Sequence, residues 1–231
     1  MEVHRRSNQL FKNIDNKSRH SFLILNIVDF YPSISAELLD KALEFAQSKV
    51  EIEQDVLNAI KNARKTLLFN KGIAWQKNTG LSDVTQGGLD SCQICELVGL
   101  YLLQQMKDKF PMINFGLYRD DGLACHKRIP GPTLEKYRKG IIKLFKENDL
   151  KITIQTGLKT VDFLDVTFNL TTETFSPYKK PNNNLLYVNK QSNHPPSVLK
   201  QIPNSVNERL NTISSNEEIF NSAKKKIMKM L

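Results

Sequence analysis

The chain has 231 residues, with 40% hydrophobic and 25% charged residues, which excludes a wholly disordered protein and allows one large domain or two small ones. Its 33 Lys and Arg outnumber 24 Asp and Glu, and the net charge of +9 favours either a polyanionic partner or a soluble protein with a basic face. Three cysteines cannot build a disulfide framework, and no apolar run reaches the roughly 20 residues that cross a bilayer. We therefore expect an intracellular protein, cytoplasmic or nuclear, with no membrane contact.

The first half of the chain predicts one strand and three helices. A nearly continuous apolar run over residues 22–28 is typical of a buried strand. Ser35 is suited to cap a helix over roughly residues 36–48. Helical spacing predicts a further helix over about residues 51–68, through Val56, Ile60, Ala63 and Leu67. A polar stretch containing glycine follows, and residues 91–108 predict a strongly apolar helix under a sheet.

The second half predicts a hairpin, a helix, further strands and two terminal helices. Two short apolar runs within residues 115–125 flank a polar turn, which is a hairpin pattern. The later elements are a helix over 133–147, a strand over 150–154, a strand or hairpin over 161–170, and helices over 196–211 and 215–231. This order predicts the α+β class, with an antiparallel sheet backed by helices.

The composition changes near residues 175–190, so we expect a domain over residues 1–175 and a basic C-terminal region over 176–231. From Lys179 onward, nine basic residues face three acidic ones. This last quarter of the chain is the better candidate for contacts to a nucleic-acid backbone.

The strongest chemical signal is Tyr118-Arg119-Asp120-Asp121, in the turn of the predicted hairpin. Two adjacent carboxylates repel each other, and a divalent cation offsets that repulsion best. The alternative is an ordinary exposed Asp-Asp-Gly turn.

These four residues resemble motif C of the reverse transcriptases, which is an aromatic residue, any residue and two Asp. The resemblance is to retrotransposon polymerases of a eukaryotic lineage and extends over nearly the whole chain. It is also carried by residues 30–34, 95–100, 161–168 and 191–196. It implies an RNA-directed DNA polymerase with a palm-like sheet backed by helices and a small helical thumb-like region.

The resemblance also implies the chemistry. Asp120 and Asp121 would bind Mg²⁺ or Mn²⁺ in a two-metal nucleotidyl transfer. The partners would be an RNA template, a DNA primer and deoxynucleoside triphosphates, while the oligomeric state stays open. Complete relatives carry a fingers region before motif A, and only about twenty residues precede the first strand here, so we expect a truncated element.

Motif A departs from the family. The expected Asp lies five residues before the aromatic sugar gate, which is Tyr31, and that position holds Asn26. Because motifs A and C must share a metal, we expect the strand at 22–28 to pair beside the 115–125 hairpin and to bring Asn26 near Asp120. An amide supplies a neutral oxygen and no charge, so we expect impaired activity. Asp29 is the only acidic residue nearby, and alternation along an ideal strand points it to the opposite face. It is a candidate substitute ligand, or else it caps the turn before Pro32.

Motif B is altered as well. Gln86 and Gly87 would contact the nucleotide or template, and Gly88 only loosely fits the small residue expected there. The spacing of Cys92 and Cys95 permits a zinc pair, but two such cysteines on a helix usually face the core.

Several later features keep two interpretations. Residues 161–170 would hold a primer-grip hairpin or a plain sheet edge. Residues 178–187 interleave aromatic and basic side chains that can bind a single strand, and Lys224–Lys226 is either basic contact surface or a solvated helix face. The rival functions are a non-catalytic nucleic-acid-binding remnant of the same fold and a scaffold domain with an accidental Asp-Asp turn.

Overall fold

The computed structural model describes residues 2–65, 67–75, 84–85, 87–178, 180 and 192–228. The chain forms two compact units, one of residues 23–156 and one that joins residues 1–22 to 157–231. The predicted boundary between residues 175 and 176 falls inside strand β9 (Thr174–Pro177), within the second of these units. As a functional division of the chain, it stays a prediction.

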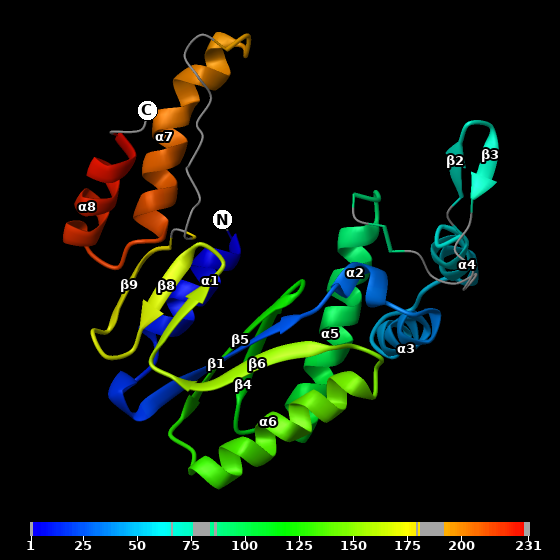
Figure 1. The fold of residues 1–231 in the computed structure, drawn as a ribbon, viewed down its shortest axis with the longest axis horizontal. Coiled ribbons are helices and arrows are strands. Elements are labelled where there is room, and N and C mark those ends of the chain that lie inside the picture. Colours follow the sequence, from blue (N-terminus) through cyan, green and yellow to red (C-terminus); the bar gives the residue numbers. More distant parts are fainter. Residues whose placement is uncertain are drawn as a thin grey trace. The chain divides into compact units, whose positions relative to one another are not determined.

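Four strands form the sheet that organises the first unit, in the order β4-β5-β1-β6. They are β1 (His20–Ile27), β4 (Asn114–Tyr118), β5 (Asp121–Lys127) and β6 (Ile152–Leu158), and their arrangement can be followed in Figure 1. Along β1, Leu23, Leu25 and Ile27 are buried while Ile24 and Asn26 are half-buried. Successive side chains of a strand point to opposite faces, so this alternation gives β1 one core face and one more open face.

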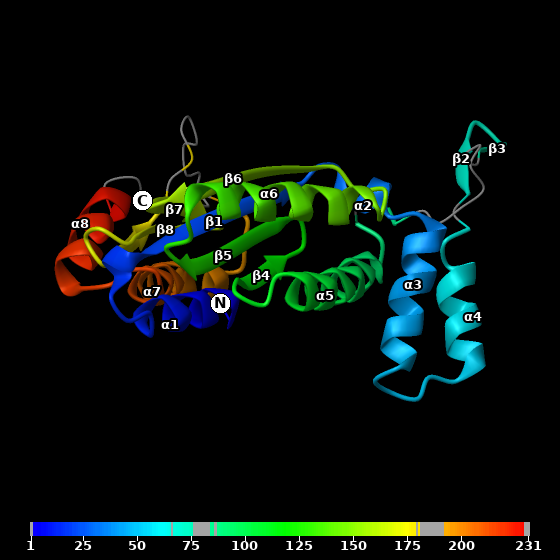
Figure 2. The ribbon, with the colours of Figure 1, turned by 90° about the horizontal axis from the view of Figure 1, so that it is seen from below.

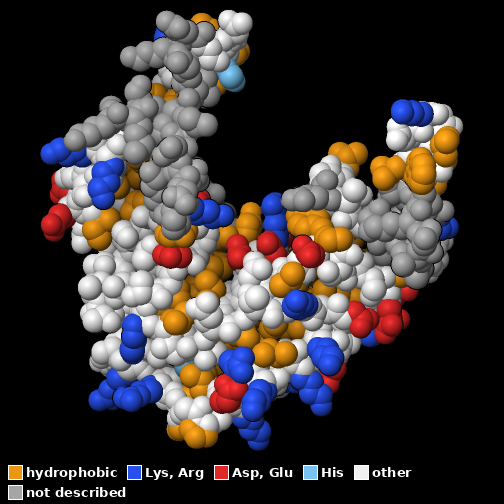
Figure 3. Space-filling model, viewed as in Figure 1, with side chains coloured by type: hydrophobic (Ala, Val, Ile, Leu, Met, Phe, Trp, Pro, Cys, Tyr) orange, Lys and Arg blue, Asp and Glu red, His pale blue; other side chains and the backbone are white. Residues whose placement is uncertain are grey.

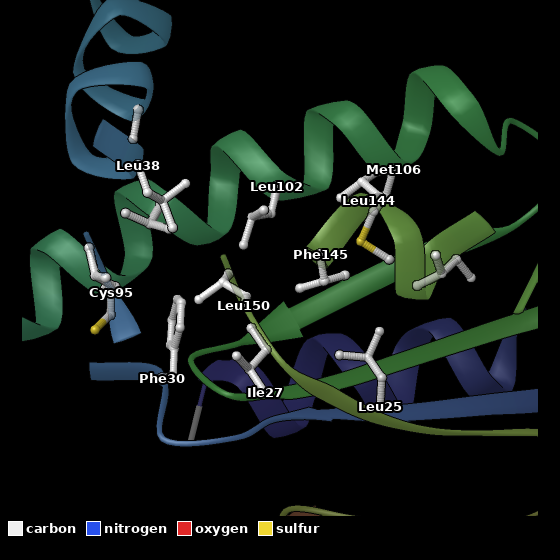
Figure 4. Close-up of a cluster of buried hydrophobic side chains, with 14 of the residues drawn as sticks. Leu25, Ile27, Phe30, Leu38, Cys95, Leu102, Met106, Leu144, Phe145 and Leu150 are labelled. Carbon is white, nitrogen blue, oxygen red and sulfur yellow. The ribbon is translucent and has the colours of Figure 1, made fainter. Parts of the chain in front are cut away.

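Helices α5 (Ser91–Lys109) and α6 (Gly131–Lys146) supply the core against which that sheet packs. Figure 4 shows their side chains meeting those of β1 in one cluster. Its labelled members are Leu25, Ile27, Phe30, Leu38, Cys95, Leu102, Met106, Leu144, Phe145 and Leu150. The predictions of a strand at 22–28, a hairpin at 115–125 and helices at 91–108 and 133–147 are confirmed.

The short helix α2 (Phe30–Ser33) and the helix α3 (Ala36–Gln47) follow β1 directly. Ser35 caps α3 as predicted, because its hydroxyl accepts a hydrogen bond from the Leu38 amide at 3.1 Å. Helix α4 (Gln54–Asn62) lies beside α3 in Figure 2, and Lys61 joins Asp40 in an ion pair of 2.7 Å between them.

The predicted helix over 51–68 is wrong beyond Asn62. Strands β2 (Leu68–Asn70) and β3 (Ile73–Trp75) form a hairpin there instead. Its two-residue turn, Lys71-Gly72, has φ angles of 52° and 79°. Positive φ at both central positions matches the twist of a hairpin, so this turn chemistry prevails over the helical spacing of the apolar residues.

The second unit contains the three-stranded antiparallel sheet β7-β8-β9, in which β7 (Thr160–Phe163) and β8 (Val166–Asn169) form the hairpin predicted for 161–170. Helix α1 (Glu2–Lys12), which the sequence interpretation missed, packs Phe11 against Phe168 and Phe175, with ring centroids 5.2 and 6.0 Å apart. The 3-10 helix η1 (Lys17–Arg19) leads from α1 toward β1.

Helices α7 (Pro196–Thr212) and α8 (Glu217–Met228) complete this unit and confirm the two predicted terminal helices, of which residues 229–231 lie outside the described part of the chain. The Asn8 amide of α1 donates a hydrogen bond of 2.6 Å to the Thr212 carbonyl, which ties α1 to the end of α7. In the described part of the chain, every helix is too short or too polar to cross a bilayer.

Candidate active site

The Asp-Asp pair lies in a tight turn between β4 and β5. Tyr118 pairs with Asp121, so Arg119 and Asp120 form a two-residue connection. Arg119 takes a φ of 56°, in the left-handed region that ordinarily favours glycine. A non-glycine residue in a sparsely populated backbone region costs on the order of 1–3 kcal/mol, and such strain is concentrated at functional sites.

Glycine is required at the residue that follows the pair. A Cβ atom built at Gly122 would lie 2.7 Å from two carbons of the Leu25 side chain. Such a distance is well inside van der Waals contact, so β1 and β5 can approach closely only because residue 122 has no side chain.

Strand β1 brings Asn26 to this turn, as the sequence predicted. The Ile27 amide donates to the Asp120 carbonyl at 2.8 Å, and the Asn26 side-chain amide donates to Asp121 Oδ1 at 3.2 Å. Both side chains are half-buried on the more open face of their strands. The motif A position and the Asp-Asp turn therefore lie side by side, which argues against the scaffold interpretation with an accidental turn.

Asp29 lies differently from both predictions made for it. Strand β1 ends at Ile27, and Asp29 takes a φ of 49° as the residue that precedes α2, so the alternation of a strand does not apply to it. Its carbonyl accepts from the Ser33 amide at 3.0 Å, but its carboxylate makes no capping hydrogen bond. Among the described residues, no three His, Cys, Asp or Glu side chains gather as a metal site, so Asp29 does not complete one with Asp120 and Asp121.

Tyr31 sits between the site and the start of α5. Its hydroxyl lies 3.8 Å from Cys92 Sγ, and burial, together with that contact, raises the pKa of Tyr31 to about 12. Burial also raises the pKa of the Cys95 thiol to about 12. The core interpretation of this cysteine pair is supported, because Cys95 is buried and Cys92 half-buried. The role of Tyr31 as a sugar gate stays a prediction.

Motif B is described in part. Gly87 takes a φ of 94°, which only glycine adopts readily, and it lies four residues before α5 begins at Ser91. Gln86 lies outside the described residues. Arg64, which is buried, pairs with the Asp90 carboxylate and so anchors the chain ahead of α5 to the end of α4.

Arg119 is a functional candidate that the sequence interpretation overlooked. Its guanidinium lies 5.3 Å from the centroid of the Tyr118 ring, and its Nε is buried without a hydrogen-bond partner among the described residues. The neighbouring Tyr118 and Tyr31 hydroxyls raise the pKa of Arg119, which is a cation at neutral pH in any case. The signal was present in the motif, since a basic residue at its variable position puts positive charge directly beside the carboxylates.

The donor set fits a divalent cation only in part. Asp120 and Asp121 supply two carboxylates, and Mg²⁺ is commonly bound by one or two carboxylates completed by water and substrate phosphates. Asn26 directs its amide N–H, and not its oxygen, at Asp121. A third charged ligand is missing at the motif A position. The residues therefore suit a single ion whose remaining ligands are substrate phosphates and water better than a preformed two-ion centre.

The structure describes only part of the segment over residues 178–187, whose aromatic and basic side chains were predicted to bind a single strand. Tyr178 follows β9, and its amide donates to the Asp165 carbonyl at 2.8 Å. Lys179, residues 181–187 and Gln191 lie outside the described residues. His194 Nδ1 lies 2.5 Å from the Ser192 hydroxyl, a local contact that assigns it no role.

The comparison with solved structures decides the fold. Apo telomerase from Candida tropicalis superposes with a TM-score of 0.56 at 11% identity, over 77% of this chain and 36% of that one. The fold is that of a polymerase palm. The RNA-dependent RNA polymerase of a human picobirnavirus shares the palm at a TM-score of 0.53, with 15% identity over 73% of this chain and 32% of that one. A telomerase from Candida tropicalis in complex with a telomeric RNA fragment matches 99% of this chain at a TM-score of 0.53 and 14% identity.

The chain spans about a third to two fifths of the length of these polymerases, and the identities show the palm fold alone. No protein-family model matches the sequence, and no curated protein matches it. The comparison therefore supports the palm fold, while the retroelement assignment rests on the motif resemblance.

Proposed function

We propose that this chain is the palm and thumb-like region of a retroelement reverse transcriptase whose nucleotidyl transfer is impaired. Its substrates would be an RNA template, a DNA primer and deoxynucleoside triphosphates. The proposal is carried by the hydrogen bond between Asn26 and Asp121, which unites the motif A position with the Asp-Asp turn across β1 and β5. The palm fold supports a polymerase ancestry.

Asp120 and Asp121 are the residues that would hold Mg²⁺ or Mn²⁺. When bound, such an ion would neutralise the triphosphate and favour ionisation of the primer hydroxyl. Asn26 can offer its amide oxygen only by rotating its side chain, which breaks its hydrogen bond to Asp121. Even then it adds no negative charge, so repulsion between two ions would be poorly screened.

Positive charge beside the carboxylates also weakens the binding of divalent cations. Arg119 is adjacent in sequence to Asp120, and one cation offsets half of the charge of the two carboxylates. A site with this balance binds two divalent ions more weakly than one with three carboxylates.

The second candidate function is a non-catalytic nucleic-acid-binding remnant of the same fold. Asn26 and Arg119 favour it, because both lower the negative charge that would repel a phosphate backbone at the site. The basic C-terminal quarter, with nine basic and three acidic residues from Lys179 onward, would supply backbone contacts.

Primer extension with Mg²⁺ separates the two functions. The purified chain would be tested alone and fused to the fingers region of a complete reverse transcriptase. We expect little or no extension from the natural sequence and a gain from Asn26→Asp, with Asp120→Ala as the inactive control. Each tenfold in rate corresponds to about 1.4 kcal/mol of transition-state stabilisation.

The outcomes discriminate clearly. Equal and robust extension with and without Asn26→Asp would contradict the impairment, and Asp29→Ala would then show whether Asp29 replaces the ligand. Loss of extension in every version, together with retained binding of RNA that weakens with salt, would favour the binding remnant.

A further inference from the structure

The β2–β3 hairpin is an apolar surface that the described protein leaves uncovered. Its exposed fractions are 65% for Leu68, 74% for Phe69, 59% for Ile73 and 57% for Trp75. Figure 3 shows hydrophobic side chains gathered over this hairpin with a basic side chain at its tip. A lone two-stranded hairpin is only marginally stable in water, and clustered apolar exposure marks an interaction surface.

The strand register separates its two aromatic rings. Leu68 pairs with Trp75, and Phe69 pairs with Ala74, so the pleat directs Trp75 and Phe69 to opposite faces. Each face of the ribbon therefore offers one exposed aromatic ring, beside Leu68 on one face and Ala74 on the other.

The charge around the hairpin is of one sign. Residues 61–82 include five basic residues and no acidic residue. Lys61 pairs with Asp40, and Arg64 pairs with Asp90. Lys65, before β2, and Lys71, in the turn, are exposed and make no ion pair with any residue that the structure describes.

We propose that the hairpin binds single-stranded nucleic acid, with bases stacked on Trp75 and Phe69 and phosphates near Lys65 and Lys71. Exposed aromatic rings flanked by cations stack bases while the backbone is neutralised, and here each face of the ribbon would stack one base on its own ring. The proposal rests on the proposed function, in which nucleic acid is the ligand.

The charge also argues against the other occupants. A second copy of the chain would present the same cationic ribbon in an isologous contact, and like charges would meet. A protein segment would use Leu68 and Ile73 as readily as the aromatic rings, because it needs apolar area and not a flat ring.

Trp75 is the only tryptophan of the chain, so its emission reports on the hairpin alone. We expect an unlabelled single-stranded RNA oligomer to quench that emission as it binds. In fluorescence anisotropy with labelled RNA, Phe69→Ala and Trp75→Ala should each raise Kd at least about fivefold, the lower end of what stacking one base contributes. Trp75→Phe should restore binding because it keeps a ring.

Leu68→Ala is the matched control, since Leu68 is the direct partner of Trp75 and is similarly exposed but has no ring. We expect Leu68→Ala to change Kd by less than about twofold, within the scatter expected for a contact that contributes no stacking. All three substituted side chains are exposed, so thermal unfolding of the variants should match that of the natural chain.

Two results would overturn the inference while leaving the proposed function intact. One is RNA binding by the natural chain without quenching and with an unchanged Kd in Trp75→Ala. The other is an equal loss in Leu68→Ala, or a change of sedimenting mass in the variants without RNA, since either would assign the hairpin to a protein contact. Absence of RNA binding by the natural chain would instead contradict the proposed function itself.

Discussion

Replacing Asn26 by Asp tests whether the motif A position and the Asp-Asp turn form one cation site. In the natural chain the Asn26 amide donates to Asp121 Oδ1 at 3.2 Å, so an Asp at that position would set two carboxylate oxygens against each other. Without a divalent cation, Asn26→Asp should therefore lower the free energy of unfolding.

The expected size follows from that distance. Two unit charges at 3.2 Å repel by about 1 kcal/mol in water and by about 5 kcal/mol at an effective dielectric constant of about 20. Both side chains are half-buried, and the carboxylates can rotate apart, so we expect a loss of about 1–3 kcal/mol. For a chain of this length, that corresponds to a decrease in Tm of roughly 2–12 °C.

Mg²⁺ should reverse this loss in the variant. A ligand present at about 100 times its Kd stabilises the folded state by about 2.7 kcal/mol. Thermal unfolding in EDTA and in Mg²⁺ should therefore show a much larger Mg²⁺-dependent rise in Tm for Asn26→Asp than for the natural chain. Mn²⁺ provides a parallel measurement with a second cation of similar ligand preference.

A swapped pair is the matched control. The double variant Asn26→Asp, Asp121→Asn keeps one amide and one carboxylate at this contact and preserves the net charge. It should unfold close to the natural chain in EDTA and gain no extra response to Mg²⁺. A variant Asn26→Asp that is as stable in EDTA as the natural chain, and insensitive to Mg²⁺, would refute the shared site.

Three further predictions concern packing, pH and charge. Gly122→Ala should destabilise the chain by about 1–3 kcal/mol in denaturant unfolding, because its Cβ would overlap Leu25; a neutral result would show that β1 and β5 separate easily. Burial lowers the pKa of His4 below 6.5 despite the attraction of Asp165, so the folded state binds the proton more weakly than the unfolded state. The free energy of unfolding should therefore be highest above pH 6.5 and should decrease as the pH falls through the folded-state pKa. His4→Gln should flatten unfolding midpoints measured across that range, and an equally steep decline would assign it to other groups. Deleting the residues after Lys200 should lower RNA affinity and the slope of log K against log salt, and an unchanged slope would place the backbone contacts elsewhere.

The fold could be predicted to a large extent from the sequence because its core elements have strong local patterns. The apolar run of β1 and the long apolar helix α5 become buried as expected. The error at residues 63–68 has a physical cause, since Leu67 lies at helical spacing yet the Lys71-Gly72 turn and the β-forming residues around it set a hairpin.

Helix α1 shows the opposite case. Its contribution to the stability of the fold depends on Phe11, which packs on Phe168 and Phe175 from strands more than 150 positions away in the chain. A short polar segment gives no local sign of such a contact, because the stabilisation comes from tertiary packing and not from helix propensity.

At the site, the motif spacing predicted that Asn26 meets the Asp-Asp turn, because residues that share a cation must converge. The argument from strand alternation does not apply to Asp29, because it assumed that β1 continued past Ile27. The left-handed φ of Asp29 turns the chain into α2, and a turn of that kind is set by the chain that follows it. Arg119 was missed since family motifs direct attention to the invariant positions and not to the variable one.

On the proposed function, the contact between Asn26 and Asp121 would let such a palm persist after its chemistry weakens. An Asp at position 26 would repel Asp121 unless a cation is bound, whereas Asn donates a hydrogen bond to the charged Asp121 carboxylate, which contributes about 1.5–3 kcal/mol. The substitution therefore exchanges cation affinity for stability without one. Selection on RNA binding alone would retain Asn26, the Gly122 contact and the basic residues, because RNA binding does not require a negative charge at position 26. Selection on polymerisation would oppose Asn26 at every step, because the interaction it removes is made mainly in the transition state.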